Sequence, residues 1–158
     1  MAEGVLAPHD HWLFAGVGLD VLRPALSAGH ESRFLPGEVI FREGDEPDGL
    51  YLITAGAARV AASGEDGETF LAVVKTNEVL GEMGVLDGER RSGTATSINM
   101  CTAYFIPSDP FLDLLETSSP VCMRLLALLT QRLRRANGRL GELPPSSTVP
   151  AEEVVREA

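Results

Sequence analysis

The chain reads GEMGVLDGERRSGTA over residues 81–95, between two segments of β-strand character. This stretch holds one short apolar turn, Met83 to Leu86, and four glycines, at positions 81, 84, 88 and 93. Glycine lets a backbone approach a bound group closely, and consecutive backbone N–H groups near Met83 and Gly84 can form a nest for an anion. The pattern therefore predicts an anion-binding bend between two strands.

Two charged side chains in this bend define the kind of anion. Arg91 carries a planar, permanently charged fork that can bind two phosphate oxygens at once. Glu82 would be repelled by a bare phosphate, but a sugar hydroxyl placed between the two groups both separates them and donates a hydrogen bond to the carboxylate. The pair indicates a sugar joined to a cyclic phosphate. Ser92 and Thr94 add hydroxyl groups near the phosphate or a base edge.

Outward from the bend, the middle of the chain has the character of short β-strands. From Ser32 to Ile106, β-branched and aromatic runs alternate with glycine, proline and aspartate turn signals about every ten residues. The expected strands are Val39–Phe41, Leu50–Thr54, Ala57–Ala61, Thr69–Lys75, Gly93–Ile98 and Cys101–Ile106. Such spacing is typical of a jelly-roll-like β-barrel. The predicted fold class is mainly β with flanking helices.

The flanking segments show helical periodicity. Residues 10–30 predict short N-terminal helices, broken at Pro24. Two C-terminal helices are expected to begin at Ser108-Asp109-Pro110 and Ser119-Pro120, where a capping side chain precedes a proline. The second should run from Pro120 to Asn137, with glycines at 138 and 141 as stop signals.

The predicted domain organisation has three parts. Residues 1–11 form an N-terminal extension and residues 12–142 the folded domain. Residues 143–158 are proline-rich and then acidic, with too little apolar surface to fold alone, so a disordered tail is expected.

The bend resembles the phosphate-binding cassette of cyclic-nucleotide-binding domains, which occur in bacterial catabolite-type regulators, cyclic-nucleotide-dependent kinases and gated channels. The resemblance rests on Gly81-Glu82-Met83-Gly84, a spacer of six residues, then Arg91-Ser92 and Thr94, and it extends over about residues 12–138. It includes the strand and turn at residues 36–45 and the strand at residues 50–56. One departure is Arg90, which stands where several members have proline.

This resemblance implies a role for each cassette residue. Glu82 would bind the ribose 2′-hydroxyl and Arg91 the phosphate, while Gly81, Met83 and Ser92 would line the pocket. The expected function is a cyclic-nucleotide sensor whose ligand repositions the last helix, with cyclic AMP slightly favoured over cyclic GMP and no other cofactor. The alternative is a protein-interaction module of the same fold with no nucleotide response.

Simpler interpretations exist for individual features. Arg91 taken alone could be a surface residue paired with Asp87 or Glu89. The last helix carries a heptad-like apolar stripe, which either packs in the core or offers a face to an unknown partner or a second copy. The stripe consists of Cys122, Leu126, Leu129, Leu133, Ala136 and Leu140.

Composition excludes several classes of function. The net charge of −10 opposes nucleic acid and anionic membranes, and the proline-rich, acidic end predicts no helix-turn-helix. No secretory signal or membrane-spanning run is expected, so a cytoplasmic location follows. The three histidines are His9, His11 and His30, and all lie outside the β-rich middle. Because the β-rich middle therefore lacks histidine, we expect neither a metal site nor an enzyme with a nucleophilic triad. Cys101 and Cys122 are expected to be reduced core residues.

Overall fold

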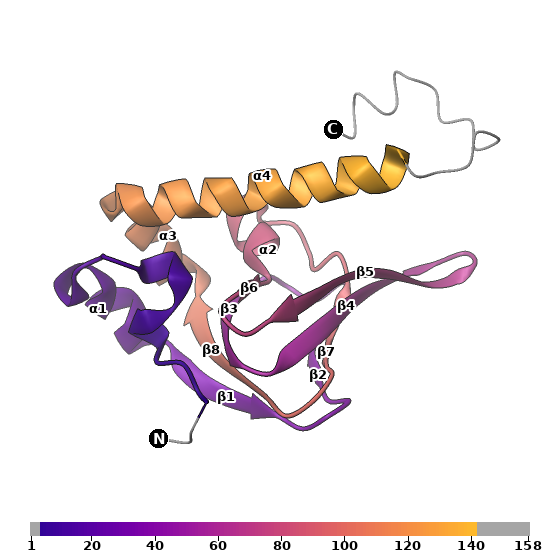
Figure 1. Cartoon of the computed structure of the whole chain (residues 1–158), viewed down its shortest axis with the longest axis horizontal. Coiled ribbons are helices and arrows are strands. Elements are labelled where there is room, and N and C mark those ends of the chain that lie inside the picture. Colours follow the sequence, from indigo (N-terminus) through magenta and orange to yellow (C-terminus); the bar gives the residue numbers. More distant parts are fainter. Residues whose placement is uncertain (1–3, 142–158) are drawn as a thin grey trace. The chain divides into compact units, whose positions relative to one another are not determined.

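The computed structural model describes residues 4–141, with the side chains of residues 139–141 excepted. The helical elements are η1 (Pro8–Asp10), η2 (Trp12–Phe14), α1 (Leu19–Ala28), α2 (Glu82–Asp87), α3 (Ser108–Thr117) and α4 (Ser119–Gly141). The strands are β1 (His30–Phe34), β2 (Val39–Phe41), β3 (Gly49–Ala55), β4 (Ala57–Gly64), β5 (Gly67–Lys75), β6 (Val79–Leu80), β7 (Thr94–Ser97) and β8 (Cys101–Pro107). Figure 1 shows this order along the chain.

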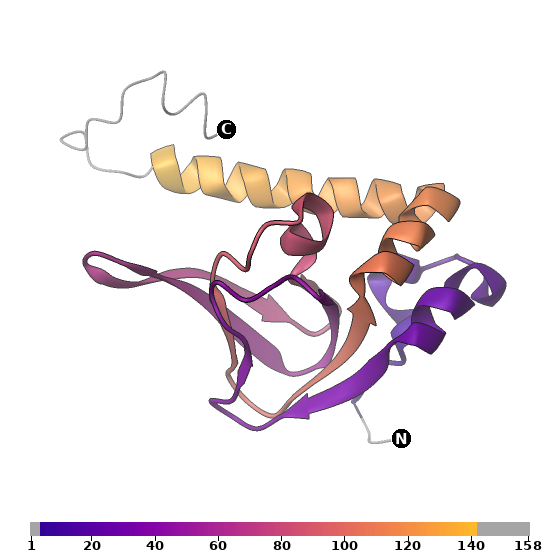
Figure 2. The same ribbon diagram turned by 180° about the vertical axis from the view of Figure 1, so that it is seen from behind.

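The strands form two antiparallel sheets of four, in the orders β1-β8-β3-β6 and β2-β7-β4-β5. The long β4–β5 hairpin reaches beyond the other strands (Figures 1 and 2). The chain passes repeatedly from one sheet to the other. In two of these crossings, β2 leads into β3 through residues 42–48, and β6 leads into β7 through residues 81–93. The predicted jelly-roll-like, mainly β architecture is confirmed, as two facing sheets and not as a closed barrel.

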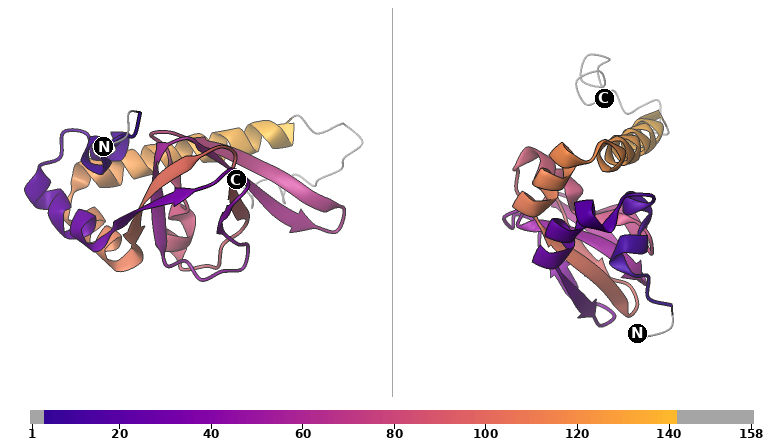
Figure 3. Two further views of the ribbon diagram at one scale, coloured as in Figure 1. Left: turned by 90° about the horizontal axis from the view of Figure 1, so that it is seen from below. Right: turned by 90° about the vertical axis from the view of Figure 1, so that its left-hand side faces the viewer.

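The core lies between the two sheets and draws on both. Its buried members are Ile53, Ala58, Val74, Leu80, Ala95, Cys101 and Ala103, and Phe41 and Tyr51 pack against them from the edge. A second buried group joins helix to sheet: Leu13, Phe14 and Leu22 from the N-terminal helices and Phe111 from α3 are all at most 1% exposed. Figure 3 shows these helices together at one end of β1 and β8.

The helix starts differ from the sequence prediction. α1 continues through Pro24, and the expected break there is wrong. The carbonyl that loses its partner is that of Asp20, an exposed residue of the first turn, where water can bind it. α3 begins at Ser108 after Pro107, so Ser108 is not the expected cap. α4 begins at Ser119, and the Ser118 hydroxyl accepts a bond of 3.4 Å from Val121 N.

The chain divides after Val121 into two units, and the second unit begins with the part of α4 from Cys122 onward. It continues past the expected stop at Gly138 and ends at Gly141. Met123, Leu126 and Leu133 on this part are 63%, 51% and 43% exposed. Their spacing of three and seven residues places them on one face of the helix. The predicted tail at residues 143–158 lies outside the described residues.

The end of the predicted N-terminal extension is joined to the sheets. Leu6 N donates to Thr54 O over 2.8 Å. His11 is fully buried; its Nδ1 accepts from Leu13 N, and its Nε2 lies 3.0 Å from Glu78 O. Because Nδ1 accepts, the proton of the neutral ring is on Nε2 and is donated to Glu78 O. The hydrogen bond of His11 thereby connects the N-terminal segment to Glu78, the residue that precedes β6.

Titration of His11 should make the stability of the protein depend on pH. Burial lowers the pKa of His11 below its usual 6.5, and the hydrogen bond to Glu78 opposes this in part. Above the pKa of the unfolded state, the neutral His11 ring therefore contributes fully to the free energy of unfolding. This contribution is lost as the pH falls from the unfolded-state pKa toward the lower pKa of the folded state. Between about pH 7 and pH 5, the free energy of unfolding should fall by up to about 1.4 kcal/mol per pH unit.

Urea unfolding across this range measures the slope. In His11→Gln, whose amide can still donate to Glu78 O but does not titrate, the slope should be smaller than in the wild type. His9→Gln is the matched control, because His9 has a half-exposed side chain that pairs with Asp10. Equal slopes in all three proteins would contradict the assignment.

Candidate functional site

The bend at residues 81–93 takes its shape from two glycines. Gly81, directly after β6, has φ 85° and ψ 15°, and Gly88, at the end of α2, has φ 73° and ψ 4°. Residues with a Cβ rarely adopt this left-handed conformation. The Gly88 N–H donates to Gly84 O over 2.9 Å and closes the helix. Between the two glycines, the six residues of α2 reverse the chain and direct it toward β7.

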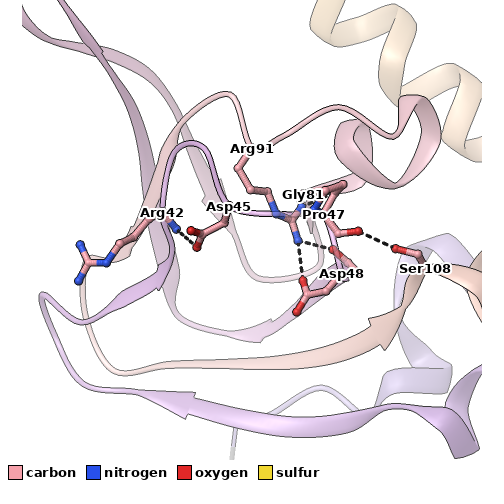
Figure 4. Close-up of polar contacts among 8 residues, drawn as sticks. Arg42, Asp45, Pro47, Asp48, Gly81, Arg91 and Ser108 are labelled. Atoms are coloured by element: carbon pink, nitrogen blue, oxygen red, sulfur yellow. Dashed lines mark hydrogen bonds and ion pairs between the residues drawn. The ribbon is translucent and has the colours of Figure 1, made fainter.

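Arg91 lies buried at the end of this bend, and its guanidinium binds to two other parts of the chain (Figure 4). Nη1 donates to Gly81 O over 2.8 Å, and Nη2 donates to Gly49 O over 2.5 Å. A third, longer bond of 3.3 Å joins Nη2 to Asp48 Oδ1. The plane of the guanidinium lies over the Phe41 ring, 4.2 Å from the centroid, within the range of a cation–π interaction. Nε is buried and has no hydrogen-bond partner among residues 4–141.

The main chain of Arg91 is fixed by the same loop that holds its side chain. Arg91 N donates to Asp45 O over 2.9 Å, and Arg91 O accepts from Gly44 N over 2.8 Å. The loop in turn is closed on itself, because Arg42 N donates to Asp45 Oδ2 over 2.9 Å. The two crossings between the sheets, residues 42–48 and residues 81–93, therefore meet at Arg91.

Glu82 is the first residue of α2 and is fully buried. It follows Gly81, whose carbonyl accepts from Arg91. A buried carboxylate residue is thus joined through the chain to Gly81, and a buried guanidinium is joined to Gly81 by a hydrogen bond. Both charged groups come from the predicted bend, and both have been removed from bulk water, which is costly for a charged side chain.

The pairing of Arg91 with Asp48 is unequal. The Arg91 side chain is 2% exposed and that of Asp48 is 71% exposed, so water screens much of the attraction from the Asp48 side. Their opposite charges also act on a third group. Burial raises the pKa of the nearby Tyr51 hydroxyl, the charge of Asp48 raises it further, and the charge of Arg91 opposes the rise. Because the Asp48 carboxylate is largely exposed and screened by water, it balances the permanent charge of Arg91 only in part.

The remaining predicted residues lie around this centre in different environments. Met83 is 55% exposed and Ser92 is exposed, while Gly84 is half-buried. A Cβ on Gly84 would lie 2.7 Å from Pro47 Cβ, so glycine is needed for the close approach of α2 to the 42–48 loop. The Thr94 hydroxyl accepts from Glu43 N over 3.0 Å and thus supports the same loop.

Sequence reasoning missed three groups that contact Arg91: the Phe41 ring, the Asp48 carboxylate and the Gly49 carbonyl. Asp48-Gly49 had the pattern of a turn and Phe41 that of a strand, and neither pattern indicates a partner that is distant in the sequence. The alternative of a surface pair for Arg91 is wrong, since Asp87 Oδ1 accepts from Glu89 N and Arg91 is buried.

Neighbouring Arg90 differs clearly from Arg91. Its side chain is 65% exposed and pairs with Glu46 over 2.8 Å.

Within residues 4–141, no cluster of three or more histidine, cysteine, aspartate or glutamate side chains has the arrangement of a metal site. In the same part of the chain, no helix has both the length and the apolar character needed to cross a bilayer.

Replacing Gly81 should disturb the bend through both its backbone and its contact with Arg91. A Cβ at this position would lie 2.5 Å from Arg91 Nη1, and the residue has a positive φ. Gly81→Ala should lower the free energy of unfolding by at least about 2 kcal/mol, as urea denaturation can measure.

The matched control is Gly88→Ala at the other end of α2. Gly88 also has a positive φ, but a Cβ there would meet nothing within 4 Å. Its cost should be limited to backbone strain, about 1 kcal/mol. If Gly81→Ala cost no more than Gly88→Ala, the close contact with Arg91 would not matter to stability.

Comparison with known proteins gives the family of this fold. The family model of the cyclic nucleotide-binding domain matches residues 31–118. Among curated proteins, the chain is 30% identical over 111 residues to the CRP-like cAMP-activated global transcriptional regulator of Mycobacterium tuberculosis, covering 70% of this chain and 50% of that protein. It is 32% identical over 126 residues to the cyclic AMP receptor protein of Thermus thermophilus, covering 79% of this chain and 58% of that protein.

Solved structures agree with these relatives. The crystal structure of the Thermus thermophilus catabolite activator protein superposes with a TM-score of 0.71 at 32% identity, over 82% of this chain and 61% of that chain. The chain spans about half the length of the curated relatives it matches. Since the family model matches more than half of its residues, the chain belongs to the cyclic nucleotide-binding domain family.

Proposed function

We propose that this chain binds a 3′,5′-cyclic nucleotide, with Arg91 on the cyclic phosphate and Glu82 on the ribose 2′-hydroxyl. The observation that carries the proposal is that two side chains of opposite charge, Glu82 and Arg91, are both buried and both connected to Gly81, the first as its neighbour in sequence and the second by a hydrogen bond. A permanent charge that is buried and only partly balanced favours a further anion. A carboxylate next to it rejects an isolated phosphate but accepts one that is joined to hydroxyl groups.

The contacts of Arg91 leave one of its donors for this ligand. Gly49 O and Gly81 O hold the guanidinium by Nη2 and Nη1, while the buried Nε–H has no partner within residues 4–141. A phosphate oxygen that takes the Nε–H would approach Nη2 as well, and there it competes with Asp48. Because the Asp48 side chain is largely exposed, its carboxylate can move into water at little cost.

The proposed ligand is cyclic AMP in preference to cyclic GMP. Both curated relatives described above carry cyclic AMP in their names, although the Ser92 hydroxyl could also bind a guanine edge. Gly81, Met83, Gly84 and Thr94 complete the proposed pocket or support its loop. The proposed role is regulatory and not enzymatic, in the cytoplasm, and it requires no metal or other cofactor.

The proposed output is a change in the position of the last helix, α4. A ligand that binds one helix position more tightly shifts the population toward it. The exposed apolar side chains of Met123, Leu126 and Leu133 offer a face to a protein partner or to a second copy of the chain. The net charge of −10 argues against nucleic acid as a partner of this domain.

A protein-interaction module without a nucleotide response is the second candidate. It is favoured by the fact that the Arg91 guanidinium already has three bonds within the protein, to Gly49, Gly81 and Asp48. Thermal unfolding separates the two candidates. A ligand at a hundred times its dissociation constant should stabilise a sensor by about 2.7 kcal/mol, whereas an interaction module should not respond.

Arg91→Ala should remove most of the affinity for cyclic AMP. Loss of a charge-assisted, two-pronged contact costs on the order of 3 kcal/mol, more than a hundredfold in the dissociation constant. Isothermal titration calorimetry measures this loss directly. The matched control is Arg90→Ala, which removes an exposed guanidinium one residue away and should change the affinity less than about threefold. Equal affinity in wild type and Arg91→Ala would remove this site from the proposal.

Glu82 can be tested against the hydroxyl that it is proposed to bind. In wild type, 2′-deoxy cyclic AMP should bind roughly tenfold or more weakly than cyclic AMP, since a buried carboxylate loses a hydrogen bond. In Glu82→Gln, the two nucleotides should differ much less, because the charged acceptor is gone. A preference for cyclic AMP that is the same in both proteins would place the 2′-hydroxyl elsewhere.

A further inference from the structure

Ser108, the first residue of α3, makes two hydrogen bonds to the loop between β2 and β3 (Figure 4). Its hydroxyl donates to Pro47 O over 3.0 Å, and its backbone N–H donates to Asp48 O over 3.0 Å. Sequence patterns gave this serine a different task, the capping of its own helix. α3 has no side-chain cap, however, and the Ser108 hydroxyl is used on the loop instead.

The two carbonyls that Ser108 binds come immediately before the groups that hold Arg91. Pro47 and Asp48 lead directly into Gly49, and Arg91 Nη2 donates to both the Asp48 carboxylate and Gly49 O. Along the chain, sixteen residues, 92–107, separate Arg91 from Ser108 at the start of α3. Through the loop, only the main chain of three residues, 47–49, lies between them.

The loop is fixed at both ends, since Arg91 N donates to Asp45 O over 2.9 Å and Gly49 pairs with Pro107 of β8. Residues 45–48 lie outside the helices and strands. Between these two points, Asp48 N donates to Glu46 O over 3.0 Å, and Pro47 packs closely on Gly84 of α2. The bonds from Ser108 to the carbonyls of Pro47 and Asp48 add to these contacts at the residues that directly precede Gly49 O and that carry the Asp48 side chain.

We propose that Ser108 is a positioning residue for the Arg91 guanidinium: its hydroxyl fixes the 47–49 main chain, and the main chain fixes the direction of the guanidinium. Its consequence for the cyclic phosphate rests on the function proposed above. A guanidinium held in one direction before binding loses less freedom when the phosphate arrives, so the bonds of Ser108 strengthen ligand affinity.

The test uses the full chain with three variants. Ser108→Ala removes the hydroxyl and keeps a residue with high helix propensity, so α3 should still form. Ser108→Thr restores a hydroxyl at the same place. Thr117→Ala is the matched control, because Thr117 stands at the other end of α3 and its hydroxyl donates to Asp113 O within the helix over 2.8 Å. It removes a helical hydroxyl bond that has no connection to the loop.

The first readout needs no ligand. Exchange of the buried Arg91 Nε–H with solvent, followed by ¹⁵N NMR, should become several-fold faster in Ser108→Ala. It should be unchanged in Thr117→Ala and close to wild type in Ser108→Thr. An exchange rate in Ser108→Ala equal to that of wild type would overturn the proposal, whatever the protein binds.

The second readout is calorimetric titration with cyclic AMP and cyclic GMP. Loss of one hydrogen bond should weaken binding roughly three- to tenfold in Ser108→Ala, with rescue in Ser108→Thr and no loss in Thr117→Ala. Unchanged or tighter binding by Ser108→Ala would overturn the link to affinity. If wild type binds neither nucleotide, the proposed function fails, and the exchange measurement still decides the role of Ser108.

Discussion

The guanidinium of Arg91 carries a permanent charge that is buried in the protein and held by two main-chain carbonyls and one exposed carboxylate. The surrounding structure can be understood as the means of keeping it there. Gly81 turns its carbonyl toward Nη1 in a conformation that favours glycine, and the Phe41 ring, which also packs on the core, supports the face of the cation. Removing any of these supports would leave a buried charge with fewer partners, which is strongly destabilising.

The sheets deliver these partners from segments that are far apart in sequence. Gly49 starts β3 in one sheet, Phe41 ends β2 in the other, and Arg91 stands in the connection that leads from β6 of the first sheet to β7 of the second. Such an arrangement needs two crossings of the chain at one point, and the bonds between Gly44, Asp45 and the main chain of Arg91 hold them together. The jelly-roll order of the strands is therefore a condition for the site as much as a way of burying the core.

The amino-acid sequence was sufficient to predict the class of fold, most strands to within two residues, and the glycine-rich bend that carries Glu82 and Arg91, whose joint role in a ligand site stays a prediction. These features depend on local signals: alternation of side chains, turn residues and a glycine-rich spacing. Strand β1 was missed because four of its five residues are polar or charged, and the two-residue strand β6 because it is too short to show a period. The partners Phe41, Asp48 and Gly49 were missed because they depend on tertiary contacts. Ser108 was assigned to the wrong task for the same reason, since a serine before a helix is a frequent cap and only the folded chain brings Pro47 to it.

The meeting of the two crossings has one more consequence, for cooperativity. Because residues 42–48 and 81–93 each connect one sheet to the other, a group bound at Arg91 would act as a cross-link between the sheets. Opening of either sheet would then release the group bound at Arg91. Binding of that group would therefore oppose partial unfolding as strongly as complete unfolding. A domain with such a link would lose its two sheets in a single transition, even though each sheet has its own set of strands.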